Sequence, residues 1–279
     1  MIAALVLAVS FAMPPQQSDA VIGVTAIHLE SGRRVSARGS ERFPMGSVYK
    51  FPIALAVLRR VDTGTLSLDR LVTIEPEEFA PGWSPLRDKA NQQPITLTVR
   101  ELLRHMVSIS DNTASDALLR LAGGPHAVSA RMAELGFGGI RIDRSEAEMT
   151  RDLRAPGGVE RYAIDARDTA TPDDMAALLV AFWKGRAGLT RESHDLLVRW
   201  MTDTPTGARR LKAAMPPDAV IAHKTGTMPG TVNDAGIVVV DGQTYAIVVF
   251  TKKGTSPEEV RENDLAAVAR AAFEAIRRR

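Results

Sequence analysis

Residues 43–60 read FPMGSVYKFPIALAVLRR, an apolar run at helical spacing that opens on two polar side chains, Ser47 and Lys50. A serine at the start of a helix lies near backbone N–H groups that have no partner and near the positive end of the helix dipole. A lysine three residues further on lies on the same face of the helix, so its amine can reach the serine hydroxyl. The stretch therefore predicts a helix whose first turn holds a serine and a lysine within reach of one another.

The pair has a chemical and a structural interpretation. Serine attacks a carbonyl group only when a neighbour takes its proton, and a lysine desolvated among Phe43, Phe51 and Leu55 is suited to that role. In the structural interpretation, Ser47 is an N-cap and Lys50 is a surface lysine whose stem covers the helix. The pattern S-x-x-K is too short to decide between them.

The composition is that of an ordinary globular protein. With 279 residues, of which 45% are hydrophobic and 24% charged, the chain can form a substantial core and one or two domains. The net charge is only +2, and no basic stripe interleaved with aromatic residues predicts a nucleic-acid groove. The chain has no cysteine, and its histidines form no H-x-x-x-H pair. We therefore expect no cofactor, no metal and no nucleic-acid partner.

Residues 1–20, MIAALVLAVSFAMPPQQSDA, contain an apolar run over residues 2–13 that is too short to span a bilayer as a helix. Ser10 and Ala12 form a small-x-small cleavage pattern, and a Pro/Gln/Ser stretch follows. We interpret residues 1–20 as a signal peptide and mature N-terminal tail, which predicts a periplasmic or secreted protein without a membrane anchor. No Lys or Arg precedes the run, and a packed N-terminal helix is the alternative.

Strand patterns lie at the two ends of the chain. Residues 21–29 and 33–37 are rich in β-branched and apolar side chains and flank a Ser31-Gly32 turn, which predicts a hairpin. Three further strands are predicted over residues 219–223, 233–240 and 244–252, followed by a helix over 257–278.

Helical patterns fill the middle of the chain. Apolar side chains recur at spacings of three and four over residues 98–105, 113–121, 127–135, 173–183 and 191–201. Because antiparallel pairing of the early and late strands joins both ends of the chain in one sheet, the order predicts two lobes. The fold class is α/β of the α+β type, with a five-stranded antiparallel sheet flanked by helices (residues 21–44 and 203–279) and an all-helical lobe (residues 45–202). Ser47 lies where the chain crosses between the lobes, and ligand clefts favour such boundaries.

The triplet Ser110-Asp111-Asn112 lies between two predicted helices. In its structural interpretation, Asp111 or Asn112 is simply the N-cap of the second helix. In its functional interpretation, Ser110 shuttles a proton, Asn112 holds a substrate carbonyl with its side-chain amide, and Asp111 is a buried strut.

The triplet Lys224-Thr225-Gly226 directly follows a strand pattern, within AHKTGTMPG. Glycine in a strand lets a ligand approach the backbone closely, and a lysine flanked by hydroxyls suits a carboxylate. The structural alternative is a bulge at the end of the strand. At average residue usage this triplet is the least frequent of the three motifs by chance.

S-x-x-K, S-D-N and K-T-G in this order resemble the motif set of class A β-lactamases and penicillin-binding proteins. The intervals between the motifs are similar to those of class A. The segment RSEAEMT, which contains Glu146, resembles the R-x-E-x-E-L-N of the class A Ω-loop, whereas penicillin-binding proteins lack that glutamate. The resemblance extends from about residue 21 to the C-terminus.

The resemblance implies a mechanism. Ser47 attacks the lactam carbonyl while Lys50 and Ser110 relay protons. The backbone N–H groups of Ser47 and Thr227 form the oxyanion hole, and Glu146 activates the hydrolytic water.

The resemblance also implies a substrate site. Lys224, Thr225 and Thr227 hold the substrate carboxylate in the strand that contains Gly226. Trp83 flanks the entrance, although a tryptophan after Gly82 is equally a partly buried anchor. Arg144 and Asp168 form the ion pair at the neck of the Ω-loop, residues 144–168.

Three features depart from the family pattern. Thr150 stands where an asparagine is usual, which predicts slower deacylation. The Ω-loop is longer than usual. Asn233 stands where many members have a carboxylate-binding arginine, and Arg210 aligns with an arginine that some members use instead. The alternative for Arg210 is a surface arginine beside Arg209.

From this resemblance we expect hydrolysis of the amide bond of penicillins and cephalosporins through a serine acyl-enzyme, which confers antibiotic resistance. The partner is then a small β-lactam molecule, and the protein is expected to be a monomer. A DD-peptidase or serine esterase on the same scaffold is one alternative. A penicillin-binding protein that deacylates slowly is the other, and Thr150 is the feature that favours it.

Overall fold

The computed structural model describes residues 7–277, and its central element is a mixed sheet with the strand order β1-β3-β2-β10-β9-β8. Five of its strands pair antiparallel, as predicted, and the two-residue β1 adds to the edge in parallel with β3. The strands are β1 (Leu7–Ala8), β2 (Val21–His28), β3 (Arg33–Ala37), β8 (Val220–Met228), β9 (Thr231–Val240) and β10 (Gln243–Lys252).

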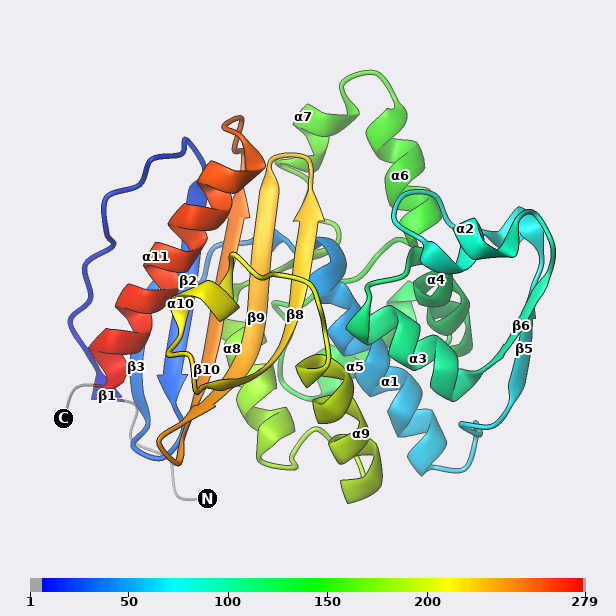
Figure 1. Cartoon of the computed structure of the whole chain (residues 1–279), viewed down its shortest axis with the longest axis horizontal. Coiled ribbons are helices and arrows are strands. Elements are labelled where there is room, and N and C mark those ends of the chain that lie inside the picture. The colour runs from blue at the N-terminus through cyan, green and yellow to red at the C-terminus, as the bar shows by residue number, and fades with distance from the viewer. Residues whose placement is uncertain (1–6, 278–279) are drawn as a thin grey trace.

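Both faces of the sheet are buried. Along β10, Ile247 and Val249 pack toward α11 (Glu258–Arg277), whereas Ala246 and Val248 belong to the cluster on the opposite face. That second cluster includes α8 (Pro172–Trp183) and continues into the helical region. Figure 1 shows α11 crossing one face of the sheet, with α8 behind it. Alternation with a period of two thus gives β10 two apolar faces.

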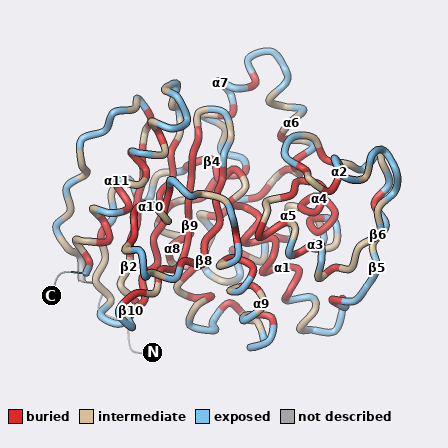
Figure 2. The backbone as a smooth tube through the Cα atoms, in the orientation of Figure 1, coloured by how far each residue is buried: buried red, intermediate tan, exposed pale blue. Residues whose placement is uncertain are grey.

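The helical region lies beside β8, and the buried part of the backbone runs through the central strands and α1 (Figure 2). Its larger helices are α1 (Lys50–Asp62), α3 (Val99–Ser108), α4 (Asn112–Leu121), α5 (Pro125–Glu134) and α9 (Arg191–Thr202). Side-chain caps set several of their starts. Thr98 and Glu101 form a reciprocal capping box on α3, and Thr171 caps α8. The predicted helices are therefore present, with ends that shift by a few residues.

Several short elements were not predicted. The strands β5 (Leu71–Ile74) and β6 (Ile95–Thr98) form a separate hairpin, and β4 (Phe43–Pro44) pairs with β7 (Thr169–Ala170). The helices of this kind are α2 (Pro85–Ala90), α6 (Glu146–Arg154), α7 (Gly158–Tyr162) and α10 (Leu211–Ala214). Apart from the nine-residue α6, which lies in the segment interpreted as the Ω-loop, each has too few residues to show a periodic pattern.

The segment before β2 lies against the edge of the sheet and α11. Val9, Phe11 and Met13 pack on the cluster that α11 covers, and Asp264 of α11 accepts hydrogen bonds from the backbone of Gln17 and Ser18. The described part of this segment forms no helix, so the packed-helix alternative is not observed there. Residues 1–6 of the predicted signal peptide lie outside the described residues. Within residues 7–277, no helix combines the length and the apolar character needed to cross a membrane.

Asn233 is a fully buried connection between the sheet and the segment that enters the Ser47 turn. Its side-chain amide donates to the carbonyl oxygens of Pro44 (2.7 Å) and Met45 (3.0 Å), and its oxygen accepts from the Thr251 N–H (2.8 Å). The side chain therefore points beneath the Ser47 turn. This corrects the alignment that placed Asn233 at a position facing a substrate carboxylate.

We predict that Asn233→Ala lowers the free energy of unfolding by about 2 to 3 kcal/mol, because it strands buried backbone groups without partners. Urea unfolding monitored by circular dichroism measures the change. Asn263→Ala, on the exposed side of α11, is the matched control and should change stability by less than about 0.5 kcal/mol. Equal effects of the two substitutions would contradict the connecting role.

Candidate active site

A cavity of about 630 Å³ opens between the edge strand β8 and the helical region. It collects residues from elements far apart in the sequence, as expected for a cleft between two lobes. The sequence-predicted residues in its wall are Ser47, Trp83, Ser110, Asn112, Glu146, Thr150, Arg210, Thr225 and Thr227.

Ser47 lies in a 3-10 turn, Gly46–Tyr49, that leads into α1. No side-chain cap is made at either helix start, so the interpretation of Ser47 as an N-cap is wrong. The turn lies directly against β8. A Cβ on Gly226 would collide with the Met45 carbonyl oxygen and would lie 3.1 Å from the Ser47 nitrogen. The absence of a side chain at Gly226 thus lets the edge strand approach the Ser47 backbone.

Lys50 is fully buried and holds several groups of the site together, so it is not a surface lysine. Its Nζ donates to the Ser110 carbonyl oxygen and to Asn112 Oδ1, each at 2.7 Å. It also lies 3.1 Å from Glu146 Oε1 and 3.4 Å from Ser110 Oγ. The ammonium therefore has one carboxylate and three neutral oxygens around it, which compensates for its burial.

Ser110 connects the two lysines of the cleft. Lys224 Nζ donates to Ser110 Oγ at 2.9 Å, on the side opposite to Lys50. Ser110 has a φ of 61°, a left-handed conformation that non-glycine residues adopt rarely and at some energetic cost. Burial lowers the pKa of Lys224 well below its ordinary value, and the positive charge of Lys50 acts in the same direction.

The first turns of α4 position both Asn112 and the loop that carries Glu146. Asp111 caps the helix through the Ala114 N–H, and its second oxygen accepts from the Leu86 N–H, so it is both an N-cap and a buried strut. One turn beyond Asn112, Asp116 accepts hydrogen bonds from the N–H groups of Glu146 (2.7 Å) and Ala147 (3.1 Å). Asp116 therefore fixes the start of α6 and with it the position of Glu146.

The motif Lys224-Thr225-Gly226 lies inside β8. Its pairing with β9 is continuous from Val220 to Met228, so the interpretation as a bulge at a strand end is wrong. Thr225 Oγ1 lies 2.8 Å from Thr206 Oγ1, and both residues line the cavity.

Arg210 reaches the same strand from behind. Its Nη2 donates to Thr227 Oγ1 (2.7 Å) and its Nη1 to the Gly226 carbonyl oxygen (3.0 Å). Glu262 pairs with Arg210 at 2.7 Å, whereas the neighbouring Arg209 is exposed and pairs with Glu259. Arg210 is thus a buried residue of the cavity wall, which corrects the surface interpretation.

Trp83 lies at the mouth of the cavity with 64% of its surface exposed. Its indole N–H donates to the Ile109 carbonyl oxygen at 2.8 Å, which holds the ring in place. Trp83 is consequently an exposed aromatic surface beside the cleft and is not a buried anchor.

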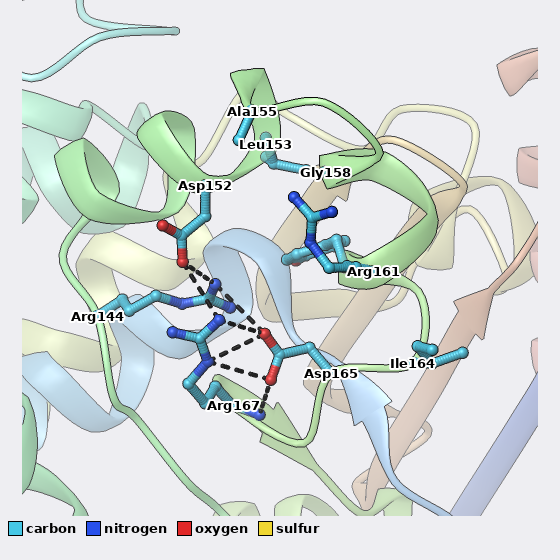
Figure 3. A pocket seen from close by; sticks show the side chains of 10 residues that line it. Arg144, Asp152, Leu153, Ala155, Gly158, Arg161, Ile164, Asp165 and Arg167 are labelled. Carbon is cyan, nitrogen blue, oxygen red and sulfur yellow. Dashed lines mark hydrogen bonds and ion pairs between the residues drawn. The ribbon is translucent and has the colours of Figure 1, made fainter.

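Arg144 and Asp168 lie in contact where the Ω-loop begins and ends. Arg144 Nε donates to Asp168 Oδ2 at 2.6 Å, and burial raises the pKa of Asp168. The other side of the guanidinium pairs with Asp152 (2.8 Å) and Asp165 (3.4 Å), which also pair with Arg167. Figure 3 shows the part of this network that Arg144, Asp152, Asp165 and Arg167 form; these four residues line a second cavity, of about 490 Å³, beside α6 and α7. Neither Arg144 nor Asp168 lines the Ser47 cavity.

Sequence reasoning missed three contributors to the site. Asp116 lies four residues after Asn112, a spacing that places both on one helix face and could have indicated it. Thr206 and Glu262 carry no motif, because their positions depend on how α9, β8 and α11 pack.

A serine, two lysines and a carboxylate around one cleft are typical of enzymes that form an acyl intermediate on serine. Comparisons with known proteins identify the class. The family model described as the β-lactamase enzyme family matches residues 6–276. The carbapenem-hydrolysing β-lactamase KPC of Klebsiella oxytoca is 34% identical over 95% of this chain and 87% of its own.

Two solved structures agree with this assignment. A β-lactamase from Chitinophaga pinensis superposes with a TM-score of 0.83 at 37% identity, covering 92% of this chain and 94% of that one. An ancestral class A β-lactamase gives a TM-score of 0.83 at 36% identity, covering 93% and 95%. The chain belongs to the β-lactamase enzyme family and, within it, to the class A serine β-lactamases.

Asp116 provides a test through pH. Burial and the nearby charge of Glu146 raise its pKa from 3.8 to about 6. The folded protein therefore binds a proton at Asp116 more readily than the unfolded chain does, and stability falls as the pH rises from about 4 to about 6. We predict that this contribution is about 1 to 3 kcal/mol and is absent in Asp116→Asn.

Urea unfolding of both proteins at pH 4.5 and 7.5 measures the contribution. The stability of the wild type relative to Asp116→Asn should be greater at the lower pH. A stability difference that is the same at both pH values would show that Asp116 titrates as an ordinary carboxylate.

Proposed function

We propose that Ser47 is the nucleophile through which this β-lactamase opens the amide bond of β-lactam antibiotics. The observation that carries this assignment is the environment of Lys50, the buried lysine one turn beyond Ser47. Its amine is held between Ser110, Asn112 and Glu146, and Ser47 and Glu146 line the same cavity. The cavity is also lined by Ser110, but it is the backbone of Ser47 that Gly226 of β8 approaches closely.

In the acylation step, the Ser47 hydroxyl loses its proton as its oxygen attacks the lactam carbonyl. Glu146 can take that proton through a water molecule, and Lys50 can take it once its ammonium has passed a proton to Glu146. Ser110, hydrogen-bonded to Lys224 and close to Lys50, delivers a proton to the departing lactam nitrogen. The ring opens, and the substrate is left as an ester on Ser47.

The negative charge on the attacked oxygen needs preorganised donors. The backbone N–H groups of Ser47 and Thr227 are the candidates, because they belong to the two segments that Gly46 and Gly226 allow to approach. A Cβ on Gly46 would lie 3.3 Å from the Thr227 nitrogen, so a side chain there would crowd the second donor.

Deacylation requires a water molecule activated by Glu146. The carboxylate is placed by Asp116 and paired with Lys50, and Thr150 lies one helical turn further along the same face of α6. A threonine hydroxyl can contact the water, but it offers fewer hydrogen-bonding groups than an asparagine amide. This difference supports a slower deacylation step. The position of Glu146 at the Ser47 cavity argues against a DD-peptidase, whose alternative required that carboxylate to point away.

The substrate carboxylate is proposed to bind along β8. Thr225 and Thr227 present hydroxyls to the cavity, and Lys224 lies fully buried behind Ser110. Arg210 acts from behind the strand, where its guanidinium donates to the Thr227 hydroxyl and leaves that oxygen polarised toward the cleft.

Action outside the cytoplasm, in the periplasm or as a secreted protein, is proposed from the apolar segment over residues 2–13 and from the small-x-small pattern of Ser10 and Ala12 near its end. We also propose that the protein acts as a monomer, because all groups that the proposed mechanism uses come from one chain. The boundaries between its two lobes are proposed at residues 44–45 and 202–203.

Mass spectrometry after mixing with a penicillin tests the two-step mechanism. Ser47→Ala should show no covalent adduct and less than about 1% of wild-type turnover, because the attacking oxygen is absent. Glu146→Gln should accumulate an adduct with the mass of the intact penicillin, because the amide cannot activate water. The wild type should return to its free mass once the penicillin is consumed. An adduct on Ser47→Ala would overturn the assignment of the nucleophile.

Arg210→Ala should raise KM for penicillins about tenfold, the effect of losing one charge-assisted contact of about 1.5 kcal/mol. Steady-state kinetics measure the change, with thermal unfolding to confirm that the variant is folded. Arg209→Ala is the matched control, because Arg209 is exposed and points to Glu259. If both variants have the same KM, Arg210 does not contribute to carboxylate binding.

A further inference from the structure

Arg261, in the first turns of α11, is a buried arginine in the wall of the Ser47 cavity. Only 8% of its surface is exposed, and its Nε and Nη1 are buried without a hydrogen-bond partner. Within residues 7–277, no carboxylate lies within ion-pairing distance of it. Arg210, in the same wall, differs because it pairs with Glu262 and Glu258. Arg261 is thus a charged group of the cleft that the protein itself leaves uncompensated.

The fold makes room for this side chain. A Cβ on Gly254 would lie 2.5 Å from Arg261 Cδ, so the arginine stem occupies the space that a side chain at residue 254 would take. The Gly254 N–H donates to the Gly230 carbonyl oxygen in the turn between β8 and β9. Arg261 therefore lies at the end of the cavity beyond Thr227, where Met228 and Pro229 form the wall.

The chemistry of arginine indicates what is missing. A guanidinium remains protonated at any physiological pH, and burying it without an anion is costly unless a ligand supplies the charge. Its planar fork matches a carboxylate with two parallel hydrogen bonds. An anionic group that enters the cleft at this end would satisfy donors that are otherwise unpaired.

The order of groups along β8 identifies which part of a substrate reaches this end. In the proposed binding mode, the carboxylate of the bicyclic nucleus lies near Thr225 and the attacked carbonyl near Thr227. The acylamino side chain is on the opposite end of a penicillin from that carboxylate, so it extends toward Met228 and Pro229. We infer that Arg261 forms a subsite for a second carboxylate, carried on the acylamino side chain of the β-lactam. This inference rests on the proposed function of the Ser47 cavity.

Two penicillins that differ by one carboxylate test the subsite. Benzylpenicillin and carbenicillin have the same nucleus and phenyl group, and carbenicillin adds a carboxylate on the side-chain carbon. The measured quantity is the ratio of kcat/KM for carbenicillin to that for benzylpenicillin. In Arg261→Met this ratio should fall about tenfold, mainly through KM for carbenicillin, because one charge-assisted contact is lost.

Two further variants make the result specific. Arg261→Lys keeps the charge but not the fork, so it should retain part of the ratio. Arg209→Met, at an exposed arginine near the same helix, should leave the ratio unchanged. An unchanged ratio in both Arg261 variants would overturn the subsite and leave Arg261 a structural residue.

A binding measurement separates this inference from the proposed function. Calorimetric titration of Ser47→Ala with the two penicillins measures binding without turnover. Adding Arg261→Met to that variant should weaken the binding of carbenicillin and leave the binding of benzylpenicillin unchanged. Failure of the wild type to hydrolyse benzylpenicillin would contradict the proposed function. If Arg261→Met weakens the binding of both penicillins equally, the subsite is contradicted while the proposed function stands.

Discussion

The burial of the Lys50 ammonium is the constraint on which the rest of the site depends. Removing a charge from water costs several kcal/mol unless oxygens replace its hydration shell. Here the replacements come from two separate segments: Ser110 and Asn112, where the chain enters α4, and Glu146 at the start of α6. Each segment must therefore be in place for the lysine to be accommodated. The same contacts that stabilise the charge also bring the proton-transfer groups together, so the stability of the cleft and its chemistry have a common origin.

A second constraint acts on the backbone. The edge strand β8 must lie against the Ser47 turn closely enough for N–H groups of both segments to face one carbonyl oxygen. Gly226 permits this approach, and Asn233 holds the turn from below through the carbonyl oxygens of Pro44 and Met45. The long antiparallel pairing of β8 with β9, and of β9 with β10, makes the edge rigid. The helical region contributes side chains to the cleft, and the sheet contributes the rigid backbone of β8. The cleft therefore needs both parts of the fold.

The sequence predicted those parts of the protein that local chemistry determines. Five strands and the main helices follow from the periodicity of their apolar residues, and the fold class was confirmed. The motif residues of the cleft were identified through their resemblance to the family. The structure brings Ser47, Ser110 and Glu146 to one cavity and places Lys50 in contact with Ser110 and Glu146.

Features that depend on tertiary packing could not be predicted from the sequence. The N-cap interpretation of Ser47 failed because a 3-10 turn precedes α1, and nothing local distinguishes the two geometries. Asn233 was aligned with a carboxylate-binding arginine of the family, yet its side chain points beneath the Ser47 turn, where three buried backbone groups need partners. The helix α6 was missed although Ser145 and Glu148 form a capping box at its start, because the segment was treated as a loop by resemblance.

The electrostatics of the Ω-loop explain why a segment with so little apolar contact can position a catalytic carboxylate. Few of its side chains enter the core: Met149 and Tyr162 are buried, while most of α7 is exposed. The loop is instead attached at two charged points, Asp116 at the start of α6 and Arg144 at the neck. The single guanidinium of Arg144 pairs with Asp152, Asp165 and Asp168, so it connects α6, the segment after α7 and the exit of the loop. Such attachment depends on protonation and on salt more than apolar packing does. We therefore expect the loop to lose order before the sheet and the helical region do, so that the step proposed for Glu146 is affected first.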